Sequence, residues 1–181
     1  GIDTIRVAAG EYQIRNLEFT SQFGNRVVIG EDKETTILNG NFEDRVVYFH
    51  QNSHSTLDGF TIKNCAEDEN AIKINGASPT LKNLIITENT RTEDSSPGGA
   101  GIYITEADGN HVEPTIDNCI FENNLAPNTS GAAIAMFASN ESTLTITNSI
   151  FTQNSADSGG AILIETGNLN IANCTFSENT A

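Results

Sequence analysis

The sequence predicts an all-β fold, a right-handed single-stranded parallel β-helix of about seven coils with three short strands per coil. Three observations support this prediction: a repeat of about one coil in length, a second apolar element between the repeats, and two columns of asparagine at fixed offsets. No stretch shows three turns of helical apolar periodicity. We therefore expect a solenoid with little helix.

The repeat covers the last two thirds of the chain. Its copies begin at Thr56, Thr80, Thr115, Thr145 and Asn170, and they read TLDGFTIKN, TLKNLIITEN, TIDNCIFENN, TITNSIFTQN and NIANCTFSEN. A shorter apolar element lies between copies, with the sequences AIKI at 71–74, GAGIYI at 99–104, GAAIAM at 131–136 and GGAILI at 159–164. A parallel β-helix needs such a period because successive coils stack about 4.8 Å apart, and each coil places the same type of residue above that of the previous coil. The right hand follows from the general chirality of parallel crossovers.

The first third repeats less clearly. We interpret Ile5 with Val7, Val27 with Ile29, and Val47 with Phe49 as three earlier copies of the apolar element, and 37–40 as one return strand. On this interpretation residues 1–181 form a single β-helix domain. Because solenoid ends need polar caps, we expect this domain to be a segment of a longer exported protein.

Two asparagine columns mark the corners of the coils. One contains Asn83, Asn118, Asn148 and Asn173, and the other contains Asn89, Asn124, Asn154 and Asn179. We expect both columns to turn inward and to stack their amides as ladders. Phe121, Phe151 and Phe176 share one register position, so we expect them to stack in the core.

Charge and composition exclude several function classes. The net charge is −15, and residues 92–181 contain 11 acidic residues and no Lys or Arg. A nucleic-acid partner is therefore excluded, since its phosphates would be repelled. Membrane insertion of this segment is also excluded, because no apolar run approaches the ~20 residues that a spanning helix needs. The partners that remain are a glycan or a surface protein.

The motifs resemble those of known surface proteins. The GGAI element with its variants, together with FENN at 121–124, FTQN at 151–154 and FSEN at 176–179, resembles the paired GGAI/FxxN repeats of the polymorphic outer membrane protein passengers of Chlamydia. The opening DTIRVAAGEY at 3–12 is similar to the first coil of many secreted β-helices of the pectate-lyase-like kind. The resemblance implies an extracellular or cell-surface protein with adhesive or polysaccharide-associated functions.

The three cysteines predict no disulfide. Cys119 and Cys174 share a register position two coils apart, about 9.6 Å, which exceeds the reach of a disulfide. Cys65 lies at a different corner, so we expect three unpaired and mostly buried thiols.

Two outward surfaces are candidate binding sites. Tyr48, Lys73, Tyr103 and Leu163 fall at outward positions of the apolar element, and the tyrosines are spaced to stack on sugar rings. Ile85, Ile120 and Ile150 form an outward apolar stripe that indicates a partner or a covering loop. Because residues 92–181 have no cation, we expect neutral or cation-bridged glycans, or a protein, to bind there.

The candidate metal site is the segment 106–113. Glu106, Asp108, Asn110 and Glu113 alternate oxygen-bearing side chains, which suits Ca²⁺. The alternative is a plain Asp-Gly turn. No other cofactor is predicted.

The sequence favours a non-catalytic role in adhesion or in contact with extracellular matrix or polysaccharide. The alternative is a carbohydrate-active enzyme, namely a polysaccharide lyase, epimerase or hydrolase. Its acids would come from inserted loops and would include Glu93, Asp94, Glu106, Asp108 and Glu113. The first role is preferred for two reasons. The outward positions of the apolar element include no acid, and the regularly repeating second half of the chain includes no Lys or Arg that could act as a base.

Overall fold

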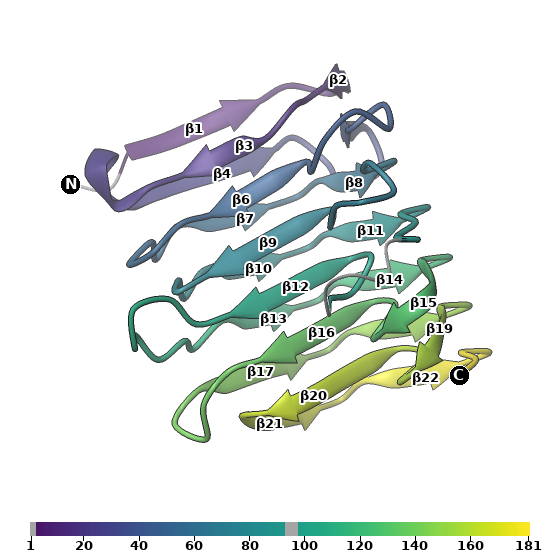
Figure 1. Ribbon diagram of the computed structural model, residues 1–181. Helices are drawn as coiled ribbons and strands as arrows, with labels where there is room; N and C mark the ends of the chain where they lie inside the picture. The colour runs from purple at the N-terminus through teal and green to yellow at the C-terminus, as the bar shows by residue number, and fades with distance from the viewer. Residues whose placement is uncertain (1–2, 93–97) are drawn as a thin grey trace.

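The protein is a parallel β-helix, as a computed structural model that describes residues 3–92 and 98–181 shows (Figure 1). The coils stack in one column from the purple N-terminal end to the yellow C-terminal end. Three long sheets, named A, B and C here, run along this column, and all of their strand pairs are parallel. A chain that repeats the order A, B, C makes six complete coils and two strands of a seventh within the described residues.

The strands of each sheet come from successive coils. Sheet A contains β1 (Asp3–Val7), β4 (Arg26–Gly30), β7 (Thr56–Asp58), β10 (Thr80–Lys82), β13 (Thr115–Asp117), β17 (Thr143–Thr147) and β21 (Asn168–Ala172). Sheet B contains β2 (Gly10–Gln13), β5 (Thr36–Asn39), β8 (Thr61–Lys63), β11 (Ile85–Thr87), β14 (Ile120–Glu122), β18 (Ile150–Thr152) and β22 (Thr175–Ser177). Sheet C contains β3 (Leu17–Phe19), β6 (Val47–Phe49), β9 (Ile72–Asn75), β12 (Ile102–Thr105), β16 (Ile134–Phe137) and β20 (Ile162–Thr166). A small fourth sheet pairs β15 (Leu125–Ser130) with β19 (Ser155–Ser158), and a single 3-10 turn, η1, spans Ser21–Phe23.

The core is built from inward files, one residue from each coil. In sheet B the file passes from Ile62 and Ile86 to Phe121 and Phe151, all fully buried. The phenylalanine stack is confirmed: Phe151 lies 4.7 Å from Phe121 and 4.7 Å from Phe176, with nearly parallel rings. The ring spacing equals the strand spacing, so each coil places its ring directly on the last.

The prediction for the first third of the chain was partly wrong. Ile5 with Val7 and Val27 with Ile29 lie in β1 and β4 of sheet A, whereas Val47 with Phe49 lies in β6 of sheet C. The first strand of sheet C is instead β3, where Phe19 stacks on Phe49 with ring centroids 4.5 Å apart. The error arose because short alternating strands look alike in all three sheets when no glycine marks the element.

One asparagine ladder is confirmed. Asn89, Asn124 and Asn154 are buried, and each donates its side-chain amide to the side-chain oxygen of the next, at 3.1, 2.9 and 3.0 Å, ending on Asn179. The same amides also donate to carbonyls of the inward file, for example from Asn124 to Ile86 at 2.9 Å. The ladder therefore satisfies backbone groups at a buried corner.

The other asparagine column does not turn inward, which corrects the prediction. Asn118, Asn148 and Asn173 are exposed and have φ values of 52 to 55°, and Asn83 at φ 49° is half-buried. Asparagine is selected there because it tolerates the left-handed backbone that the tight bend between sheets A and B requires. The exposed side chains still bond between coils, as when Asn118 donates to Asn83 at 2.7 Å.

The cysteine prediction is confirmed. All three thiols are free, with Cys65 and Cys119 buried and Cys174 partly so. Burial raises the pKa of both buried thiols to about 12, which leaves them protonated and unreactive. In the part of the chain that the structure describes, no helix is long and apolar enough to cross a membrane.

Candidate functional site

The outer face of sheet C brings the predicted aromatic and basic residues into one file. Lys73 pairs in register with Tyr48 on one side and with Tyr103 on the other. Leu163 lies in the same file but is separated from Tyr103 by Ala135. All four predicted residues of this surface are half-buried. The file begins with one acid that the prediction omitted, Glu18, which pairs with Tyr48.

Lys73 bridges the two tyrosines. Its Nζ lies 5.8 Å from the ring centroid of Tyr48 and 5.9 Å from that of Tyr103, within the range of cation–π attraction. The rings therefore stand on either side of one ammonium group. Burial is the main cause that lowers the pKa of Lys73, and burial likewise raises the pKa of the Tyr103 hydroxyl.

Two arginines from the corner between sheets B and C add positive charge. Arg45 places its Cζ 4.9 Å from the ring centroid of Tyr48 and pairs with Glu69 at 2.5 Å. Arg91 is buried, donates to the carbonyl of Asp68 at 2.8 Å, and, like Arg45, contributes to the lowered pKa of Lys73. Glu69 opposes that effect. Sequence reasoning missed both arginines, since neither lies on a strand of sheet C.

We call Arg45, Tyr48, Lys73, Arg91 and Tyr103 the basic aromatic cluster. It gathers three cations and two aromatic rings within a chain whose net charge is −15. Such an arrangement offers stacking surfaces for planar or ring-shaped groups and positive charge for an anionic substituent. Two acids lie beside the cluster: Glu69 pairs with Arg45, and Glu18 lies 3.4 Å from Nε2 of His50, whose ring contacts that of Tyr48.

The predicted apolar stripe lies on a different sheet. Ile85, Ile120 and Ile150 pair in register on the outer face of sheet B, and Ile150 is 41% exposed. At one end Thr61 is buried and donates to the carbonyl of Lys33 at 2.6 Å, so a loop covers that end. The structure therefore separates the two predicted binding surfaces rather than joining them.

The structure does not gather the four predicted calcium ligands. Glu106 faces the following coil, where it accepts hydrogen bonds from Ser139 and Ser142 at 2.6 and 2.5 Å. Asp108 accepts from Gln51 of an earlier coil at 2.7 Å. Asp108 and Gly109 have positive φ and form the tight turn that an Asp-Gly pair favours.

The other two predicted ligands also stand apart. Glu113 is exposed, and Asn110 closes the turn by donating its backbone amide to the Ala107 carbonyl. Among residues 3–92 and 98–181, no three His, Cys, Asp or Glu side chains are close enough to hold a metal ion. Calcium binding by this loop stays a prediction that the geometry does not support.

Glu106 instead makes a testable contribution to stability. Hydrogen bonds from Ser139 and Ser142 lower the pKa of its carboxyl from 4.5 to about 2. Because the folded pKa is depressed, the stabilisation is complete above pH 4.5 and is lost as the pH falls toward 2. We expect Glu106→Gln to lower the free energy of unfolding by about 1–2 kcal/mol at pH 7. Urea unfolding at pH 7 and pH 3 measures this difference, which should shrink at pH 3; a loss that is equal at both values would contradict the role of the charge.

Of the loop acids named for the alternative enzymatic role, the structure describes those in the 105–114 loop. Glu93 and Asp94 lie outside the described residues. The Glu106 carboxylate accepts hydrogen bonds from two serines. The ring nitrogens of His111 lie 3.5 Å from the Glu106 carboxylate and 2.6 Å from the Glu141 carboxylate. Glu106 and His111 therefore make their contacts with residues 139–142 of the following coil.

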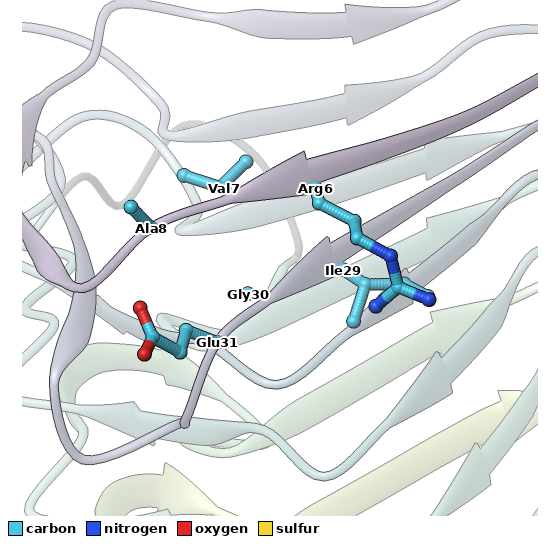
Figure 2. Close-up of a pocket in the computed structure, with 6 residues that line it drawn as sticks. All are labelled: Arg6, Val7, Ala8, Ile29, Gly30 and Glu31. Carbon is cyan, nitrogen blue, oxygen red and sulfur yellow. The ribbon is translucent and has the colours of Figure 1, made fainter.

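One surface hollow lies at the N-terminal coils, between β1 and β4 (Figure 2). It measures about 440 Å³ and is lined by Arg6, Val7, Ala8, Ile29, Gly30 and Glu31. Arg6 and Glu31 point to opposite ends of this hollow (Figure 2), and Glu31 already accepts a hydrogen bond from the Ala9 amide at 3.0 Å. The hollow therefore has no set of converging polar groups, and we do not assign a site to it.

Comparison with known proteins identifies the family. The family model described as a right-handed beta helix region matches residues 2–124 and 70–181. A solved structure, the pectin methylesterase PemA from Erwinia chrysanthemi, is similar with a TM-score of 0.66 and 10% sequence identity. The similarity covers 99% of this chain but only 58% of that enzyme, and at this identity it shows the fold alone. None of the curated proteins with which the sequence was compared matches it. The predicted right-handed winding is thus confirmed, and the chain belongs to the family of right-handed β-helix regions.

Proposed function

We propose that this chain is a non-catalytic, glycan-binding segment of an extracellular or cell-surface β-helix protein. The single observation that carries the proposal is the basic aromatic cluster on sheet C, where Lys73 lies between Tyr48 and Tyr103. The two rings are two strand spacings apart, about 9.6 Å, so one extended sugar chain lying along the solenoid axis reaches both. The resemblance of the GGAI and FxxN elements to surface passengers supports the location.

The charges favour a glycan that carries carboxylate groups. Arg45 and Lys73 lie over the tyrosine rings, and the charge of Arg91 acts on Lys73 and Tyr103. Glu69 pairs with Arg45. A carboxylate that reaches Lys73 gains a charge-assisted hydrogen bond in a half-buried setting. This revises the expectation of a neutral or cation-bridged glycan, which considered only residues 92–181. The similarity to a pectin methylesterase makes pectin-type polymers a reasonable first probe.

Replacing Lys73 tests the proposal. We expect Lys73→Gln to weaken binding to polygalacturonate about five- to tenfold, because the variant keeps the stem of the side chain but loses the ammonium group between the rings. Affinity electrophoresis or calorimetry measures the change. Lys82→Gln is the matched control, since Lys82 is exposed on sheet A and away from the cluster.

Two results would contradict the proposal. Equal loss in both lysine variants would indicate nonspecific attraction to positive charge. Release of unsaturated uronides, methanol or new reducing ends during the binding assay would show catalysis and would favour the enzymatic role instead.

A further inference from the structure

A second hollow, lined by polar side chains, opens beside the basic aromatic cluster at the ends of three strands of sheet C. It measures about 320 Å³, which is within the range of small-ligand pockets. The turns after β3 and β6 and the last residue of β9 line it with Thr20, Gln22, His50, Gln51, Asn52 and Asn75. These segments come from the first three coils, so the stacking of the solenoid creates the hollow.

The hollow is directly connected to Tyr48. The Asn75 side-chain amide donates to the Tyr48 hydroxyl at 3.1 Å. The His50 ring lies 3.8 Å from the Tyr48 ring, with 30° between the planes. Tyr48 therefore directly contacts two residues of the lining, so a ligand over its ring lies beside the hollow.

The lining is chemically suited to hydroxyl groups. Its side chains are amides, hydroxyls and one imidazole, and they include no Lys, Arg, Asp or Glu. Amide and hydroxyl groups both donate and accept hydrogen bonds, as sugar hydroxyls do. Outside the lining, the nearest charge to His50 is Glu18, whose carboxylate lies 3.4 Å from Nε2.

Two polar atoms at the hollow have no hydrogen-bond partner. They are Thr20 Oγ1 and His50 Nε2, and both are buried. Glu18 is near His50 Nε2 but does not complete a hydrogen bond with it. Buried polar atoms without a partner are rare in native proteins and cost free energy. Both atoms lie beneath the lining with almost no accessible surface, so a ligand hydroxyl reaches them only when the lining side chains shift.

We propose that this hollow binds one neutral, hydroxyl-rich sugar residue. The inference rests on the proposed glycan-binding function and deepens it: the basic aromatic cluster holds acidic units, and the hollow holds a neutral unit at the N-terminal end of the same chain of sugars. Gln51 is positioned for this role because its side-chain nitrogen is held by Asp108 at 2.7 Å, which fixes the amide at the edge of the hollow.

The test is an NMR titration of the ¹⁵N-labelled chain with neutral monosaccharides, namely glucose, galactose, xylose and N-acetylglucosamine. We expect at least one of them to shift the amide signals of Gln22, His50 and Asn52 at millimolar concentration. In Gln22→Ala and Thr20→Val the affinity for that sugar should fall at least fivefold. Thr20→Val should also leave the melting temperature unchanged or raise it, because the hydroxyl that it removes has no partner.

Controls separate this inference from the proposed function. Thr145→Val changes the same residue type on the outer face of sheet A and should leave the monosaccharide affinity unchanged. Lys73→Gln should weaken polygalacturonate but not the monosaccharide. If none of the four sugars shifts the hollow, or if they shift it equally in Gln22→Ala and Thr20→Val, the inference is wrong even where polygalacturonate still binds to the cluster.

Discussion

Phe151→Ala is expected to lower the free energy of unfolding by about 3–5 kcal/mol, the cost of truncating a fully buried aromatic side chain. Phe151 is completely buried, and its ring is stacked between Phe121 and Phe176 at 4.7 Å on both sides. Neighbouring coils cannot close the space, because the strand spacing is fixed by backbone hydrogen bonds. Equilibrium unfolding in urea measures the loss.

The matched control for this prediction is Phe176→Ala. Phe176 belongs to the same stack but is 48% exposed on the last coil, so its loss should cost clearly less. Similar costs for the two variants would mean that position within the stack does not matter, and this would contradict the described burial.

The second large effect is expected at the buried asparagine ladder. Asn124→Ala removes donors to the Ile86 carbonyl and to the Asn154 side chain, each at 2.9 Å. It also removes the acceptor for the Asn89 amide at 3.1 Å. These groups stay buried and lose their partners, so we expect a loss of about 2–4 kcal/mol in the free energy of unfolding.

The neighbouring residue provides the control. Asn123 is exposed and has φ 54°, a conformation that glycine adopts without strain. Asn123→Gly should therefore change the free energy of unfolding by less than about 1 kcal/mol. If thermal or urea unfolding gave Asn124→Ala and Asn123→Gly the same stability, the ladder would have no special role.

Much of the fold could be predicted because a solenoid repeats its constraints. Each coil places the same residue type at the same position, so Phe121, Phe151 and Phe176 reveal their stacking by spacing alone. The same logic failed in the first third, where β1 and β4 belong to sheet A. Gly30 lies there at the corner position of Gly59 one coil later, but the prediction assigned the phase from the alternating apolar residues alone. It also misjudged Asn118 and Asn148, because a fixed corner position does not reveal whether the side chain or the backbone is the feature selected.

The candidate site was only partly predictable for a related reason. Tyr48, Lys73 and Tyr103 lie on strands, so their register follows from the repeat. Arg45 and Arg91 come from corners of varying length, where spacing in the sequence gives no position in space. The lining of the polar hollow could not be predicted for the same reason, since two of its three segments are turns.

The most direct test of the account is to map where an acidic oligosaccharide binds. In an NMR titration of the ¹⁵N-labelled chain with oligogalacturonate, we predict the largest amide shifts at Tyr48, Lys73 and Tyr103 on sheet C, and these shifts should be strongly reduced in Lys73→Gln. Shifts confined to Ile85, Ile120 and Ile150 on sheet B, or no shifts at millimolar oligosaccharide, would contradict the assignment of sheet C as the glycan-binding face.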